Sequence, residues 1–288
     1  MKKILVIGGS GFLGAYIVDE LNQRNYDVTV ADVKKSKSNI KYIKCDILNN
    51  DDLEFAFSHN FDYVYNFAAL ANLDDANKNP IKTLELNLLA NMKIVELCIK
   101  NNIKKYIFSS SAYAMSEKGS FYGVSKLAAE KSIEQYHKKY GLDFIIIRYG
   151  SVYSEKDFNN NYVYNLIKDA VKNNTIIHNG DGNEYREYIH AIDASKLSVD
   201  VLENDDYTNK HIILTGSQGI KRKDLFNMIN EILGDKLEIK LNKDSKNDHY
   251  KFTPYSFQPS ISRKLSPNPQ IDLGQGILEI IRNVNDKK

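Results

Sequence analysis

Tryptophan is absent from the 288-residue chain, and cysteine, proline and arginine are scarce. The two cysteines, Cys45 and Cys98, are too few for a disulfide framework. The apolar residues around both are typical of packed thiols in a reducing compartment. The sequence therefore predicts a cytoplasmic protein without disulfide bonds.

Long apolar runs are also missing, and neither sign of charge dominates. No run approaches the roughly 18 to 20 residues that cross a bilayer, and glycines follow the first apolar run, at residues 4–7, where a signal peptide would carry a cleavage site. The 39 basic and 37 acidic residues leave a net charge of +2, and the six histidines are scattered without the spacing of metal ligands. We expect neither nucleic acid nor a membrane as partner, and no metal.

Short β-branched runs alternate with longer amphipathic segments over residues 4–148. Continuous apolar character in such runs indicates strands that are covered on both faces, and the segments between them are long enough for crossover helices. The pattern predicts an α/β fold with a doubly wound parallel sheet of the Rossmann type. The predicted strands are residues 4–7, 27–31, 41–45, 63–67, 105–109 and 144–148, and the longest predicted helices between them are 13–24, 80–101 and 122–140.

The pattern changes after Gly150, where turn residues become frequent and the predicted strands and helices are less regular. Four of the five prolines lie in the last 35 residues, which predicts a loop-rich end closed by a helix at 273–284. We predict a cofactor-binding Rossmann domain over residues 1–150, to which segment 186–215 returns. A smaller, mixed substrate-binding region is predicted over residues 151–288.

Glycines follow the first predicted strand at the spacing Gly8-x-x-Gly11-x-x-Gly14 and lead into a helix. A missing Cβ permits the tight turn, the close approach of backbone to a pyrophosphate and the close packing of helix on strand, and the helix N-terminus offers N–H donors. Asp32 ends the second strand, where a carboxylate can accept hydrogen bonds from an adenosine ribose. The same carboxylate would repel a 2′-phosphate, although lysines follow closely, so the motif predicts NAD as the cofactor.

Tyr122 and Lys126 open a predicted helix and lie four residues apart, on one face of it. A nearby ammonium stabilises a phenolate and lowers a tyrosine pKa from about 10 toward neutrality, which suits an acid/base group. The alternative is a surface tyrosine beside a solvated lysine, the usual situation of such a pair among 19 tyrosines.

Further motifs accompany the glycine turn and the tyrosine–lysine pair. Together, and in this order, they resemble those of the extended short-chain dehydrogenase/reductases, in particular the NAD-dependent epimerase/dehydratase group that acts on nucleotide-linked sugars. The resemblance extends to about residue 200. The additional motifs are Asp46-Ile47, Phe67-Ala68-Ala69, Asn87, Phe108-Ser109-Ser110-Ser111, the stretch from Arg148 to Tyr153, and the stretch from Gly180 to Asp193.

The resemblance implies a complete set of cofactor-binding residues. Asn87 would support the backbone of the active site, and Lys126 would bind the nicotinamide ribose beside Tyr122. The pyrophosphate would be held by Gly8, Gly11, Phe12, Leu13 and Gly14, the adenosine ribose by Asp32, and the adenine by Asp46 and Ile47, while Phe67, Ala68, Ala69 and Ser109 would complete the dinucleotide site.

It also implies catalytic and substrate-binding residues. Ser111 would hydrogen-bond the sugar oxygen, Tyr122 would be the acid/base, and Lys126 would assist it. Arg186 would clamp the diphosphate, for which a planar guanidinium is well suited; an ion pair with Glu184 or Glu187 is the alternative. Arg148 is equally compatible with a structural ion pair.

One departure bears on the reaction. In the family's 4,6-dehydratases an Asp-Glu pair follows the active-site hydroxyl residue, whereas Ala112 and Tyr113 follow Ser111 here and cannot act as acid and base. The resemblance then implies hydride removal at C4 of a nucleoside-diphosphate sugar, by a 4-epimerase or a net 4-dehydrogenase. A 4-ketoreductase and a noncatalytic dinucleotide sensor remain alternatives.

The resemblance also implies a homodimer. In relatives the helices that correspond to residues 80–101 and 122–140 pair across a two-fold axis. The apolar positions Leu84, Leu88, Met92, Val95 and Ile99 could serve that interface or the face of the sheet.

Overall fold

A parallel sheet of eight strands forms the centre of the computed structural model, which describes residues 1–35, 40–156, 158, 161–242 and 263–287. Its strand order is β13-β10-β6-β5-β4-β1-β2-β3, and every neighbouring pair is parallel. The order reverses between β1 and β4, which makes that gap the switch point where such sheets bind ligands. The prediction of a doubly wound parallel sheet is confirmed. The strands are β1 (Lys3–Ile7), β2 (Asp27–Asp32), β3 (Lys41–Lys44), β4 (Tyr63–Asn66), β5 (Lys105–Ser111), β6 (Asp143–Tyr149), β10 (Lys210–Leu214) and β13 (Arg263–Leu265).

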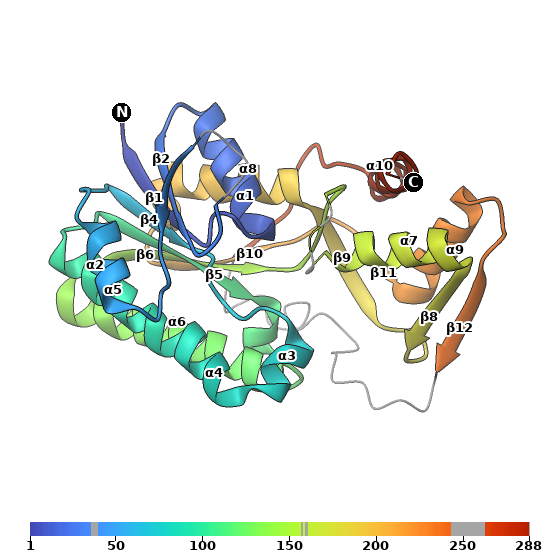
Figure 1. The fold of residues 1–288 in the computed structure, drawn as a ribbon, viewed down its shortest axis with the longest axis horizontal. Coiled ribbons are helices and arrows are strands. Elements are labelled where there is room, and N and C mark those ends of the chain that lie inside the picture. Colours follow the sequence, from blue (N-terminus) through green and yellow to red (C-terminus); the bar gives the residue numbers. More distant parts are fainter. Residues whose placement is uncertain (36–39, 157, 159–160, 243–262, 288) are drawn as a thin grey trace.

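Helices cover both faces of this sheet (Figure 1). On one face lie α1 (Phe12–Gln23) and α8 (Ala191–Glu203), which pack against each other. On the other lie α2 (Asn50–Phe57), α5 (Ala90–Lys100) and α6 (Ser120–Tyr140). Each face has its own cluster of buried apolar side chains, so the strands are apolar on both sides, as the continuous runs predicted.

The predicted helix at 80–101 is present but is interrupted by a π-helical turn. It consists of α4 (Pro80–Leu84), the π segment η1 (Glu85–Leu89) and α5, and the short helix α3 (Leu73–Lys78) precedes it. Val95 is fully buried in the core, and Leu88 and Ile99 pack against that core. These three apolar positions therefore serve the sheet face.

Two smaller sheets lie beside the central one. The first has the order β11-β9-β7, and the second joins β8 and β12 in parallel. A separate apolar core fills the space between these strands and three helices. The elements are β7 (Ser151–Tyr153), α7 (Tyr162–Asn173), β8 (Thr175–Asn179), β9 (Tyr185–His190), β11 (Gly219–Lys221), α9 (Arg222–Ile232), β12 (Glu238–Asn242) and α10 (Leu273–Asn285), with the short 3-10 turns η2 (Ala112–Met115) and η3 (Asp205–Tyr207) elsewhere.

Later parts of the chain return to the central sheet. Strands β10 and β13 extend it beyond β6, and α8 packs on its α1 face. Much of the predicted loop-rich end, residues 243–262, lies outside the described residues, and the closing helix is present as α10. The division into two domains at residue 150 stays a prediction. Within the described residues, no helix combines the length and the apolar character needed to cross a membrane.

Candidate active site

The loop between β1 and the first turn of α1 is packed so closely that side chains are excluded at Gly8 and Gly14. Gly8 has a φ of +76°, and a Cβ there would lie 2.5 Å from the backbone nitrogen of Ala68. A Cβ on Gly14 would lie 2.3 Å from the carbonyl oxygen of Gly8. The loop therefore stays close to the sheet, and α1 begins directly after it, with the N–H donors of its first turn at the switch point.

A first cavity of about 240 Å³ lies beside this loop at the ends of β1 and β2. Asp32 lines it, and its carboxylate accepts hydrogen bonds from the backbone N–H groups of Ser10 and Lys34, each at 3.0 Å. Asp32 thus joins the end of β2 to the glycine loop. Eight residues predicted to bind the cofactor line this cavity, namely Gly8, Gly11, Asp32, Asp46, Ile47, Phe67, Ala68 and Ala69.

A second cavity of about 290 Å³ adjoins the first and shares four of its lining residues, Gly8, Gly11, Phe67 and Ala69. It reaches the end of β5 and the start of α6. The predicted residues that line it in addition are Phe12, Leu13, Gly14, Ser109, Ser111 and Tyr122.

A third cavity of about 270 Å³ adjoins the second on the side of the smaller sheets. Ser111 and Tyr122 line both, so they lie where the second and third cavities meet. Ser111 is the last residue of β5, and its hydroxyl accepts a hydrogen bond of 3.2 Å from the N–H of Tyr113. The structure therefore brings the predicted acid/base and hydroxyl residues to one place.

Asn87 lies in the π segment and joins two elements of the site. Its side chain hydrogen-bonds the N–H of Leu70 at 2.8 Å and the carbonyl of Leu70 at 3.1 Å, and it donates to the Ser125 hydroxyl at 3.0 Å. The loop after β4 is thereby attached to the helix that carries Tyr122. A π turn shifts one residue out of the regular helical register, and such turns are frequent at functional sites. The position of Asn87 agrees with the supporting role that the resemblance implied, and the role itself stays a prediction.

Lys126 lies on α6 one turn after Tyr122 and is only 3% exposed. Its Nζ donates to the carbonyl oxygen of Ser109 at 2.7 Å and lies 6.0 Å from the centroid of the Tyr122 ring. Burial lowers the pKa of Lys126 to about 7, and Glu130 opposes that shift. The lysine is therefore a packed part of the site and not the solvated surface residue of the alternative interpretation.

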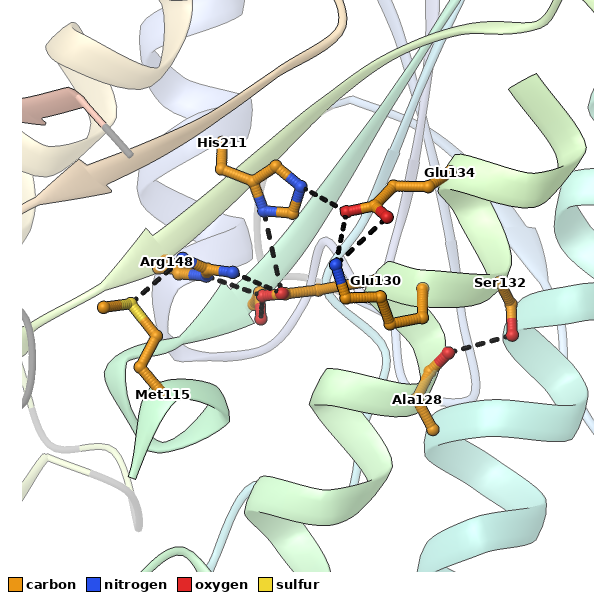
Figure 2. A network of polar contacts seen from close by, with 9 residues as sticks. Met115, Ala128, Glu130, Ser132, Glu134, Arg148 and His211 are labelled. Carbon is orange, nitrogen blue, oxygen red and sulfur yellow. Dashed lines mark hydrogen bonds and ion pairs between the residues drawn. The ribbon is translucent and has the colours of Figure 1, made fainter. Parts of the chain in front are cut away.

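A buried ion network begins one helical turn beyond Lys126 (Figure 2). Glu130 is fully buried and accepts hydrogen bonds from Arg148 Nε at 2.9 Å and Arg148 Nη2 at 2.7 Å. The Ser110 hydroxyl also donates to Glu130, and His211 Nδ1 lies 3.7 Å from it. The role of Arg148 was open from the sequence, and in the structure Arg148 forms a buried ion pair with Glu130. Glu130 was not predicted.

Two arginines line the third cavity. Arg186, the predicted substrate residue, is 2% exposed, and its Nη1 donates to the carbonyl of Tyr185 at 2.8 Å. Arg222, the first residue of α9, was missed. Its position one residue before Lys223 made it one of several cations at a predicted helix start, and no motif singled it out. The pairing of β11 with β9 brings it near Arg186.

The comparison with protein-family models gives one match, to the NAD dependent epimerase/dehydratase family, over residues 4–216. The chain belongs to this family. The match begins at β1, ends just after β10, and includes the glycine loop, Tyr122, Lys126 and Arg186.

Two curated epimerases resemble the chain over most of its length. A putative UDP-glucose 4-epimerase of Methanocaldococcus jannaschii is 28% identical and aligned over 96% of this chain and 97% of its own length. A UDP-glucose 4-epimerase of Lacticaseibacillus casei is 25% identical, over 81% of this chain and 82% of its own.

Solved structures of the family share the fold. The UDP-glucose 4-epimerase of Thermotoga maritima superposes with a TM-score of 0.86 at 24% identity, over 99% of each chain. The UDP-N-acetylglucosamine 4-epimerase of Methanobrevibacter ruminantium superposes with a TM-score of 0.83 at 25% identity, over 100% of this chain and 99% of that one.

The residues of this family member fit NAD, the cofactor on which the family depends. The close packing at Gly8 and Gly14 holds the glycine loop against the sheet, directly before the N–H donors at the N-terminus of α1 that would bind a pyrophosphate. The first cavity carries the Asp32 carboxylate that suits a ribose without a 2′-phosphate. The second cavity extends from that loop to Tyr122, so the residues that would hold the nicotinamide end adjoin the predicted acid/base.

Exchanging Lys126 for methionine is expected to stabilise the NAD-free protein more at pH 6 than at pH 9. At pH 6 the folded protein holds a buried ammonium. Between about pH 7 and 10.5 the folded state releases this proton while the unfolded state keeps it. The free energy of unfolding of the wild type therefore rises with pH, by up to about 1.4 kcal/mol per unit. The variant lacks this rise, and urea unfolding at several pH values measures the difference.

The exposed Lys131 of the same helix provides the control. Its exchange for methionine is expected to change the free energy of unfolding by a similar amount at pH 6 and pH 9. If the effect of Lys126→Met is equally independent of pH, the buried lysine does not titrate in this range, and the assignment is wrong.

Proposed function

We propose that the protein is an NAD-dependent 4-epimerase of a nucleoside-diphosphate sugar, with UDP as the nucleotide. The observation that carries the proposal is the position of Ser111 and Tyr122 at the junction of the cofactor cavity and the third cavity, with Lys126 buried behind Tyr122. UDP is proposed because the relatives of Methanocaldococcus jannaschii and Lacticaseibacillus casei are both named UDP-glucose 4-epimerases.

In this proposal Tyr122 moves the proton and Ser111 orients the sugar. The Tyr122 hydroxyl accepts the proton of the C4 hydroxyl as that carbon is oxidised, and it returns the proton when the carbonyl is reduced. Ser111 hydrogen-bonds the same sugar oxygen, and the Lys126 ammonium favours the phenolate. When bound, NAD supplies the hydride acceptor and, once reduced, the donor.

Dehydration is disfavoured by the chemistry of the two cavities. Removing water from a sugar needs an acid and a base next to the reacting carbons. Among the described residues that line the second and third cavities none is acidic, and Ala112 and Tyr113 occupy the positions after Ser111. The site therefore supports oxidation and reduction without elimination.

Product analysis tests the proposal. Purified protein with NAD is incubated with UDP-glucose, UDP-galactose, UDP-N-acetylglucosamine and UDP-glucuronic acid, followed by NMR and mass spectrometry. We expect at least one of them to be converted to its C4 epimer at unchanged mass, without net accumulation of NADH. Loss of two hydrogens with stoichiometric NADH would instead make the protein a dehydrogenase, and loss of water would make it a dehydratase.

The 4-ketoreductase and the noncatalytic sensor remain the rival functions. A reductase would convert a 4-keto sugar with NADH and would not isomerise the panel. A sensor has no use for a buried lysine beside a tyrosine at the junction of two cavities, so the arrangement favours an enzyme.

The homodimer also stays a proposal, supported by apolar side chains on the helices of the α6 side. Val95 and its neighbours face the sheet, but other large apolar residues of these helices are exposed. They are Ile81, Leu89, Phe121, Val124 and Leu127, which are between 40% and 69% exposed.

A further inference from the structure

We propose that Arg222 is a second diphosphate-binding residue, which acts together with Arg186 on the same substrate. The inference rests on the proposed function, since it concerns the nucleoside diphosphate of that substrate. Neither the motifs nor the resemblance assigned a role to Arg222.

The strand register places the two guanidinium groups on one face. In the antiparallel pair β9–β11, Ile220 lies opposite Arg186, and Lys221 lies opposite Tyr185. The N–H of Arg222 donates to the carbonyl of Glu184 at 2.9 Å, which continues the pairing by one residue. Side chains alternate along a strand, so residues 184, 186, 220 and 222 point to the same side. Both arginines accordingly line the third cavity.

The charges around this cavity call for an anion. Arg186 and Arg222 are 2% and 8% exposed, and they are the only charged residues among the described residues that line it. Two buried carboxylates lie nearby, and one of them, Glu184, lies opposite Arg222 in the strand pairing and interacts with it electrostatically. Glu184 lies 3.1 Å from His178 Nε2, and Glu187 pairs with Lys264 at 2.8 Å. Neither glutamate lines the cavity, so an anion bound there would offset the two buried cations further, and a diphosphate carries negative charge for both arginines.

The guanidinium group of Arg222 is held by an aromatic ring, and one of its N–H donors has no hydrogen-bond partner among the described residues. Its guanidinium carbon lies 4.3 Å from the centroid of the Tyr162 ring, a stacking arrangement that holds the planar group in place. Its Nε is buried and has no hydrogen-bond partner in the described part of the chain. A buried donor without a partner is costly, and a phosphoryl oxygen would satisfy it.

Titration calorimetry of the NAD-loaded protein tests the inference with UDP, UMP and uridine. For Arg222→Gln we expect the Kd of UDP to rise about 10- to 100-fold, because a charged hydrogen bond is lost, and the Kd of uridine to stay within twofold. Arg222→Lys keeps the charge without the fork, so a smaller rise is expected. In turnover, KM for the UDP-sugar rises while kcat changes less than threefold.

Lys223→Gln is the matched control, since Lys223 is the next residue of α9 and is exposed; UDP binding should be unchanged. The inference is overturned if Arg222→Gln and Arg222→Lys both bind UDP like the wild type. It is also overturned if the variants lose affinity for UDP-glucuronic acid alone, which would assign Arg222 to a sugar carboxylate. Wild type that binds UDP without epimerising any sugar refutes the proposed reaction alone. Wild type that binds no nucleoside diphosphate refutes both.

Discussion

Replacing Tyr122 by phenylalanine is expected to lower kcat for epimerisation by about 10²- to 10⁴-fold, the range that acid/base groups contribute. Tyr122 lies where the second and third cavities meet and is 9% exposed, and its hydroxyl is the acid/base in the proposed reaction. Phenylalanine keeps the ring and its contact with Tyr113 but cannot take a proton. Initial rates with the UDP-sugar identified by product analysis measure the loss.

NAD content and thermal stability separate a chemical effect from a structural one. Both should match the wild type, because the substitution removes one oxygen. Tyr140→Phe is the control, since Tyr140 lies on the same helix and is 51% exposed; its rate should be unchanged. A Tyr122→Phe enzyme with full activity would exclude the proposed proton transfer.

The sheet was predictable because its physical requirement is visible in the sequence. A strand covered by helices on both faces must be apolar throughout, and the six runs between residues 4 and 148 show this directly. The strands of the smaller sheets are less apolar. β12 alternates exposed and half-buried residues over its five positions, and β8 alternates buried and exposed residues from its second position onward. β9 begins at Tyr185, three residues before the apolar pair Tyr188 and Ile189.

The π turn was not predictable from periodicity. Residues 80–101 have apolar positions at near-helical steps, and inserting one residue into a turn changes that spacing too little to detect. Yet the turn carries Asn87, which connects the loop after β4 to α6. The resemblance singled out Asn87, and the structure adds its hydrogen bonds to Leu70 and Ser125.

The candidate-site residues that could be predicted from the sequence belong to recognisable local patterns, either a glycine where no side chain fits or a pair of residues at a fixed spacing. No side chain fits at Gly8 or Gly14, and Tyr122 and Lys126 lie four residues apart on one face of α6. Glu130 and Arg222 could not be predicted because the residues around each of them come from a distant part of the sequence. Glu130 meets Arg148 across 18 positions, and Arg222 approaches Arg186 only through the pairing of β11 with β9.

Glu130 is connected to Lys126 through strand β5. Ser109 accepts the hydrogen bond from Lys126, and the next residue, Ser110, donates to Glu130. Arg148 lies opposite Ser110 in the pairing of β5 with β6. The ion pair therefore holds the same piece of β5 that positions the lysine.

Exchanging Arg148 for methionine is accordingly expected to lower the free energy of unfolding by about 3–5 kcal/mol, the typical effect of removing one partner from a buried ion pair. Glu130, which is fully buried, would keep the Ser110 hydroxyl and His211 but lose its two closest charged donors. Urea unfolding of the NAD-free protein at pH 8 measures the loss.

The double variant Glu130→Gln/Arg148→Met decides whether the buried charge is the cause. Once the carboxylate is gone, no uncompensated charge remains, and the loss should shrink to less than about half of that in Arg148→Met, because neutral replacements of buried pairs are often well tolerated. Lys104→Met provides the surface comparison: Lys104 pairs with Asp62 at 2.7 Å but is 63% exposed, so its loss should be below about 1 kcal/mol. If Arg148→Met and the double variant are equally destabilised, the loss comes from packing of the long arginine side chain, and the network in Figure 2 contributes little through its charges.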